Sequence, residues 1–157
     1  MRSDRDATEA LLRCGADVNG LCPATISTTG QFDAKINVRG EVKIQGDLSP
    51  LHLATLRGAE PVIQQLLRYK PDLGLMCHAQ LDLQCAVSTG MSIQADIKVQ
   101  FKANALHLAI LLGREDMVRQ YLAAGMKPSS DGEGTLVYLA QVLRRQSIAQ
   151  LLAQNGG

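Results

Sequence analysis

Apolar and polar residues along this 157-residue chain alternate with two different periods. In three stretches, 49–58, 104–113 and 135–144, apolar residues recur at i, i+3 and i+4, which places them on one face of a helix. A second amphipathic run follows each stretch, at 61–67, 116–122 and 147–152. The pattern predicts a pair of short helices used three times. One such pair cannot bury its apolar face alone, whereas stacked pairs can.

Two segments, one before the first of these stretches and one before the second, have period two instead. Apolar and polar residues alternate from Phe32 to Gln45 and again from Leu81 to Phe101, and the alternation is interrupted at Arg39–Gly40 and at Thr89–Gly90. This pattern predicts two β-hairpins that turn at those dipeptides. Because an isolated hairpin is marginal in water, we expect the two to form a small antiparallel sheet beside the helices. Its free edge could accept a partner strand, or the hairpins could be structural additions only.

Two short motifs link the helical stretches to a known family. Leu-His-Leu-Ala occurs at 51–54 and 106–109, and Gly-Ala-Asp-Val-Asn occurs at 15–19. These motifs resemble the start and the end of ankyrin repeats, which recur about every 33 residues. The resemblance implies a mainly α fold, an ankyrin-repeat solenoid of stacked helix hairpins. A small antiparallel β extension would come from two long finger insertions.

The expected organisation is a single ankyrin-repeat domain over residues 1–157. Its parts are a half repeat at 4–19, a β insertion at 22–47, a repeat at 49–73, a second β insertion at 75–102, a repeat at 104–128 and a C-terminal capping repeat at 133–157. The half repeat contains only the second helix of its pair, about Asp4 to Cys14. We therefore expect the chain to be a fragment of a longer array or a protein with an unusual start.

Composition narrows the functional classes. The net charge is +1, and aromatic residues are 3% of the chain with no Trp. A base-stacking surface or a nucleic-acid-binding patch is therefore not expected, and neither is a membrane span. Four cysteines are too few for a disulfide scaffold, so we expect reduced thiols in the cytoplasm or the nucleus.

Candidate chemistry is sparse. Cys77, His78 and Cys85 could form a thiol or zinc site, but zinc ligands usually come two to four residues apart. Cys14 and Cys85 are instead expected to be small core residues. In ankyrin repeats the signature histidine, here His52 and His107, braces the turn by hydrogen bonds to the backbone. The sequence predicts no catalytic, cofactor-binding or metal-ligating residue and no cofactor.

The strongest indication of a binding surface is a row of mostly leucine residues, at positions that in ankyrin repeats line the concave groove. Leu56, Arg57, Leu111, Leu112 and Leu143 occupy this row, and a bare row of leucines would favour aggregation. The cover is either a partner protein or the two hairpins folded over the groove. The expected partner-binding residues are those of the row together with three hairpin residues: Arg39, Glu41 and Thr89.

These observations favour a non-catalytic protein–protein interaction module, not an enzyme, that binds an unidentified protein through the groove and the finger hairpins. A regulatory or substrate-recruiting segment of a larger enzyme or ubiquitin-ligase-type scaffold is the alternative. A Cys/His metal site is the remote one. We expect a monomer that could associate through the hairpin edges, with no nucleic-acid or membrane partner.

Overall fold

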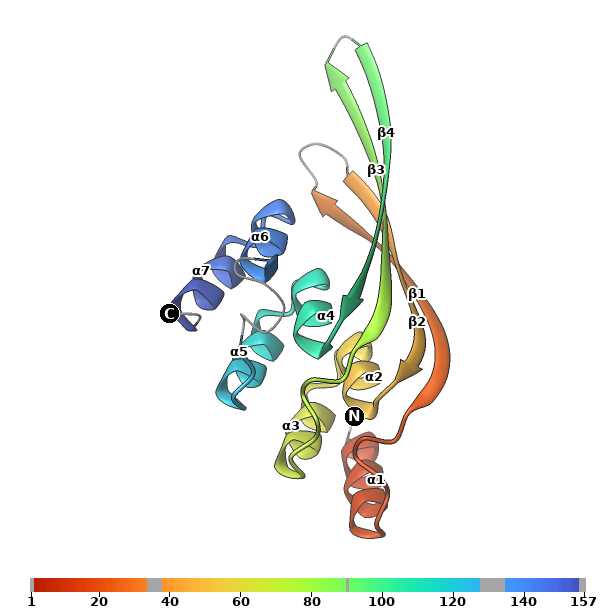
Figure 1. The fold of residues 1–157 in the computed structure, drawn as a ribbon, viewed down its shortest axis with the longest axis vertical. Coiled ribbons are helices and arrows are strands. Elements are labelled where there is room, and N and C mark those ends of the chain that lie inside the picture. Colours follow the sequence, from red (N-terminus) through yellow and green to blue (C-terminus); the bar gives the residue numbers. More distant parts are fainter. Residues whose placement is uncertain (1, 34–37, 90, 128–134, 156–157) are drawn as a thin grey trace.

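The computed structural model describes residues 2–33, 38–89, 91–127 and 135–155, which form seven helices and one sheet of four strands (Figure 1). The helices are α1 (Arg2–Arg13), α2 (Pro50–Arg57), α3 (Glu60–Arg68), α4 (Ala105–Leu111), α5 (Glu115–Ala123), α6 (Thr135–Val142) and α7 (Gln146–Asn155). The strands are β1 (Cys22–Asp33), β2 (Val38–Leu48), β3 (Cys77–Thr89) and β4 (Met91–Ala103).

The strands follow one another in the order β1-β2-β3-β4, and every neighbouring pair is antiparallel. The pairing of β2 with β3 joins the two hairpins, as the alternating pattern predicted. The predicted turn at Arg39–Gly40 is wrong, because both residues lie inside β2 opposite Gln31 and Gly30. At the second hairpin, Thr89 pairs with Met91. Residues 34–37 and Gly90 lie outside the described residues.

The expected mainly α ankyrin solenoid is wrong. The four strands are 11 to 13 residues long and form a continuous sheet, so the fold is a mixed α/β one. The prediction treated the hairpins as a small β extension of a helical stack. A large part of the core instead lies between the sheet and the helices, because the helices alone leave one apolar face uncovered.

Three layers follow from this arrangement (Figure 1). The helices pack as the pairs α2–α3, α4–α5 and α6–α7, and α2, α4 and α6 form the row nearer the sheet. One core cluster lies between the two rows of helices and includes Ile63, Ile110 and Tyr121. The other lies between the inner row and the sheet, where Ile44 and Leu108 are both 1% exposed or less.

The middle inner helix, α4, is surrounded on all sides. Every residue from Ala105 to Leu111 is buried, which suits a segment whose residues are all apolar except the capping His107. Its start is capped reciprocally: the Asn104 side chain accepts from the His107 backbone, and His107 Nδ1 accepts from the Asn104 backbone N–H at 3.3 Å. The Ser49–His52 pair caps α2 in the same way. The predicted bracing role of both histidines is confirmed.

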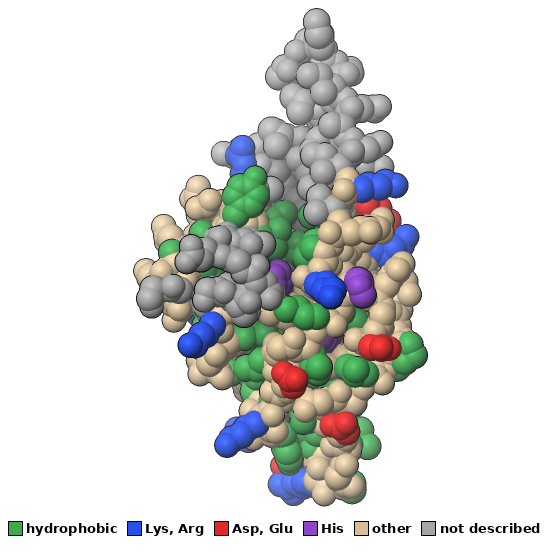
Figure 2. All heavy atoms as spheres, in the orientation of Figure 1, with side chains coloured by type: hydrophobic (Ala, Val, Ile, Leu, Met, Phe, Trp, Pro, Cys, Tyr) green, Lys and Arg blue, Asp and Glu red, His purple; other side chains and the backbone are tan. Residues whose placement is uncertain are grey.

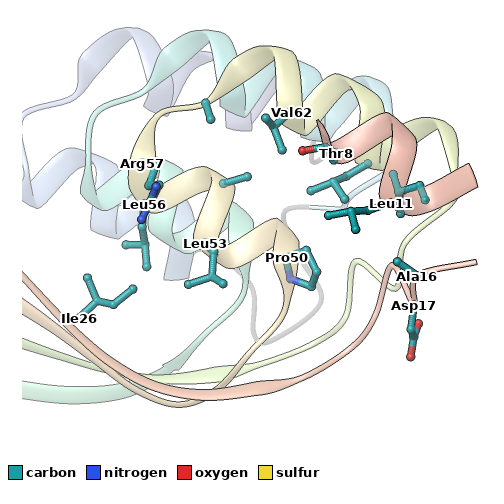
Figure 3. Close-up of a pocket in the computed structure, with 14 residues that line it drawn as sticks. Thr8, Leu11, Ala16, Asp17, Ile26, Pro50, Leu53, Leu56, Arg57 and Val62 are labelled. Atoms are coloured by element: carbon teal, nitrogen blue, oxygen red, sulfur yellow. The ribbon is translucent and has the colours of Figure 1, made fainter. Parts of the chain in front are cut away.

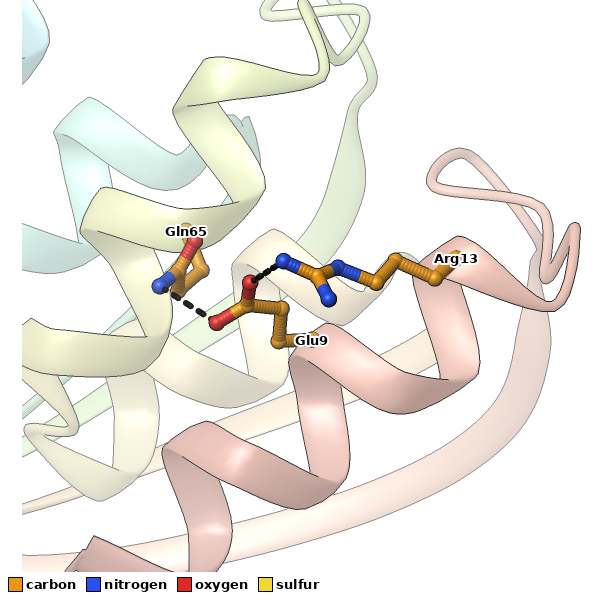
Figure 4. A network of polar contacts seen from close by, with 3 residues as sticks. All are labelled: Glu9, Arg13 and Gln65. Carbon is orange, nitrogen blue, oxygen red and sulfur yellow. Dashed lines mark hydrogen bonds and ion pairs between the residues drawn. The ribbon is translucent and has the colours of Figure 1, made fainter.

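The N-terminal helix α1 has no paired inner helix among the described residues and packs principally on α3. Polar contacts join the two helices (Figure 4). The side-chain amide of Gln65 in α3 lies 3.4 Å from Glu9 Oε2 of α1, and Glu9 forms an ion pair with Arg13 of its own helix at 2.6 Å. None of the described helices is both long enough and apolar enough to cross a membrane.

Candidate functional site

The predicted groove is largely closed by the sheet. Leu111 is 1% exposed and Leu143 is 4% exposed, and both belong to the cluster formed with β2, β3 and β4. Leu112 is half-buried. The sequence allowed either a partner protein or the hairpins to cover the leucine row, and in the structure the sheet formed by the hairpins covers Leu111 and Leu143. Leu111 and Leu143 therefore present almost no surface to a partner.

The three hairpin residues do not converge on the groove. Arg39 and Glu41 lie in β2, an interior strand, where they pair with Gln84 and Asp82 of β3. Thr89 is the last residue of β3, in the part of the β3–β4 hairpin that extends beyond the helices (Figure 1). The expected set of partner-binding residues is thus distributed over separate places.

Leu56 and Arg57, in contrast, line a pocket of about 640 Å³. Its walls come from α1, α2, α3 and β1, and Figure 3 shows Leu11 of α1, Val62 of α3, Leu53 of α2 and Ile26 of β1 around it. The lining is apolar except for three residues: Thr8, Asp17 and Arg57. This volume and this lining are typical of binding sites rather than of packing defects.

The rim of the pocket is accessible. The side chain of Leu11 is 62% exposed although it lines an apolar surface. Leu21 is 53% exposed and lies outside the pocket lining. Large apolar side chains at the edge of an apolar pocket are typical of an interaction surface. We therefore take the pocket between α1, α2, α3 and β1 as the candidate functional site.

The cysteines are not arranged for a shared site. Cys77 is buried, donates from Sγ to the Ala103 carbonyl at 3.2 Å, and has its thiol pKa raised to about 11 by burial. His78 is exposed, because successive residues of a strand point to opposite faces. Cys14 is also exposed, so its predicted place in the core is wrong. The side chain of Cys85 lies outside the described residues.

Buried histidine chemistry belongs to the helix caps. Burial lowers the pKa of His52, and a backbone hydrogen bond at Leu75 opposes that shift. Its Nδ1 accepts from the Ser49 backbone N–H at 3.2 Å, an arrangement that needs an unprotonated Nδ1. His52 is therefore held neutral as part of the fold.

Charge is dispersed over the face drawn in Figure 2, where basic and acidic side chains lie among uncharged ones. Within the described ranges, no group of three or more His, Cys, Asp or Glu side chains could hold a metal ion. The apolar pocket is thus the candidate that we consider further.

Comparison with known proteins supplies no assignment: no family model, no curated protein and no solved structure matches this chain. The pocket must therefore be interpreted from its own residues.

The sequence singled out two of the pocket residues, Leu56 and Arg57, as part of the leucine row over the expected groove. It did not indicate Leu11, Leu53 or Ile26. One signal was present. The first helix has the place of the outer helix of a pair, and among the described residues it lacks the inner partner helix that the three later pairs have. An unpaired helix beside a stack leaves the neighbouring inner helix open on one side.

Proposed function

We propose that this chain is a non-catalytic protein-interaction module that binds a partner protein at the pocket between α1, α2, α3 and β1. The single observation that carries the proposal is this apolar pocket of about 640 Å³ with an accessible leucine on its rim. Binding there would remove apolar surface from water, which is the main favourable contribution to protein association.

The proposal relocates the binding surface from the leucine groove. Leu56 and Arg57 remain in the binding set, and Leu11, Leu53 and Ile26 join it. Leu111 and Leu143 are excluded from the binding set because they belong to the core cluster between the inner helices and the sheet.

The test compares two exposed leucines. Leu11 lines the pocket and Leu21 does not, yet both side chains are more than half exposed, so neither substitution should unfold the protein. Wild type, Leu11→Glu and Leu21→Glu would each be used as bait in quantitative affinity purification from the source cells. We expect partners that bind wild type and Leu21→Glu but are lost with Leu11→Glu. An identical set of retained proteins for all three baits would contradict the proposal.

A further inference from the structure

The inner helices α2 and α4 carry nearly the same sequence but are buried to different extents. Their shared Leu-His-Leu-Ala motif places Leu53 in the position of Leu108, and three residues later Leu56 in the position of Leu111. Leu108 and Leu111 are 0% and 1% exposed, whereas Leu53 and Leu56 are only partly buried. Since the side chains are the same, the difference comes from the neighbours.

The neighbours of α4 are an inner helix on each side, α2 and α6, its own outer partner α5, and the sheet through β4. The helix α2 has α4 on one side only. On its other side lies the pocket, whose walls are α2 itself, the outer helix α1, and the sheet through β1 (Figure 3). These are the same kinds of element that enclose α4. The pocket therefore has the surroundings of an inner helix that is not present among the described residues.

The two charged residues of the lining indicate a direction for such a helix. Asp17 lies beyond the Pro50 end of α2, and Arg57 lies in its last turn (Figure 3). A helix carries partial positive charge at its N-terminus and partial negative charge at its C-terminus. A helix parallel to α2 would place its N-terminus near the Asp17 carboxylate and its C-terminus near the Arg57 guanidinium. Both placements are electrostatically favourable, and the antiparallel orientation would be unfavourable at both ends.

We propose that the pocket is the seat of an amphipathic helix from the partner protein, about two turns long, that runs parallel to α2. This inference rests on the proposed function and adds the form and orientation of the ligand. The occupant presents leucine and alanine on one face, as α2 and α4 do, and it has no acidic side chain at the end that meets Asp17. A second copy of this chain and an extended peptide are the occupants that the test must distinguish from it.

The probe is a synthetic peptide based on residues 49–58, acetylated and amidated, in which a Lys and a Glu introduced four residues apart form a lactam bridge that holds the peptide helical. The bridge is needed because a helix this short is marginal in water. The α2 sequence is suitable because α2 already packs beside an inner helix in the same way. A bridged peptide of the same composition, with its apolar residues spread around the helix, is the matched control.

Binding would be followed by amide chemical-shift changes in the full chain. We expect saturable changes in α1, α2 and β1 with the probe and none with the control peptide. Leu11→Glu should weaken binding roughly ten-fold or more, since it places a charge where the bound helix would cover an apolar side chain, while Leu21→Glu leaves binding unchanged. Asp17→Asn keeps an oxygen for the Asn19 backbone N–H and should weaken binding about two- to five-fold at low salt.

Orientation is tested with a nitroxide spin label at either end of the probe. A label at the N-terminus should broaden amide signals near Asp17, and a label at the C-terminus should broaden those near Arg57. The reverse pattern would overturn the parallel orientation, and equal binding of the control peptide or of an unbridged extended peptide would overturn the helical ligand.

Dimers of the wild-type chain that dissociate with Leu11→Glu would assign the pocket to a second copy and likewise overturn the inference. Failure of the peptide while Leu11-dependent partners are still captured would reject the helical ligand but not the proposed function.

Discussion

Leu111 tests whether the sheet is an integral part of the core. Its side chain is 1% exposed and packs in the cluster between the inner helices and the sheet, whereas its neighbour Leu112 is half-buried and outside that cluster. Without the sheet, both residues would face solvent in the expected groove. The pair Leu111→Ala and Leu112→Ala therefore separates the two architectures with a matched chemical change.

The magnitudes follow from burial. Truncating a buried leucine to alanine removes three carbon groups, worth about 0.8 kcal/mol each, or roughly 2.4 kcal/mol in all before the cost of the cavity. With the cavity included, we expect Leu111→Ala to lower the free energy of unfolding by about 2–5 kcal/mol. The half-buried Leu112 has less area to lose, and we expect a loss of about 1 kcal/mol.

Urea unfolding followed by circular dichroism measures both losses. With a urea dependence of roughly 2 kcal/mol per molar, Leu111→Ala should lower the midpoint by about 1–2.5 M, and Leu112→Ala by about 0.5 M. The slope of the transition should stay the same in both variants. Equal losses for the two alanine variants would refute the reasoning, because the sheet would then not cover Leu111.

Further substitutions test the buried polar groups and a helix end. Burial lowers the pKa of His52, so as the pH falls through about 6.5 the unfolded chain binds a proton before the folded chain does. The free energy of unfolding should therefore fall as the pH drops below that value. His52→Gln keeps a capping-box side chain without a charge and should flatten this fall; parallel urea midpoints between pH 8 and about pH 5 would contradict the assignment. Tyr121→Phe should lower the free energy of unfolding in urea by about 1 kcal/mol, because it removes the hydrogen bond from the Tyr121 hydroxyl to Thr55 Oγ1, whose own proton is donated to the Leu51 carbonyl. An unchanged midpoint would show that this hydrogen bond does not stabilise the fold. Gly58→Ala should cost about 1–2 kcal/mol in thermal unfolding, since φ is +69° and the new Cβ would lie 3.2 Å from an Arg114 nitrogen; an unchanged Tm would show that the end of α2 tolerates a side chain.

Many local features of the fold could be predicted from the sequence. Period-3.6 stretches became helices, and the alternating stretches 38–45 and 81–101 lie in strands, because burial of one face imposes its spacing on the residues that form it. Most of β1 lies before the alternating stretch, so the alternation did not predict that strand. The capping role of the histidines came from the resemblance to ankyrin repeats, and it is local, since Ser49 and His52 interact across a single turn. The row of leucines correctly indicated that something had to cover Leu111.

What covers the row was decided by contacts between residues distant in sequence. Only the pairing of β2 with β3 makes the two hairpins one sheet, and only the packing of that sheet on α4 makes the molecule α/β rather than a helical stack. The exposure of Cys14 and the pocket beside α2, which is lined by residues from α1, α2, α3 and β1, likewise became visible only in the tertiary structure. Periodicity specifies which face of an element must be buried, but the element that buries it depends on how all the faces fit together in three dimensions.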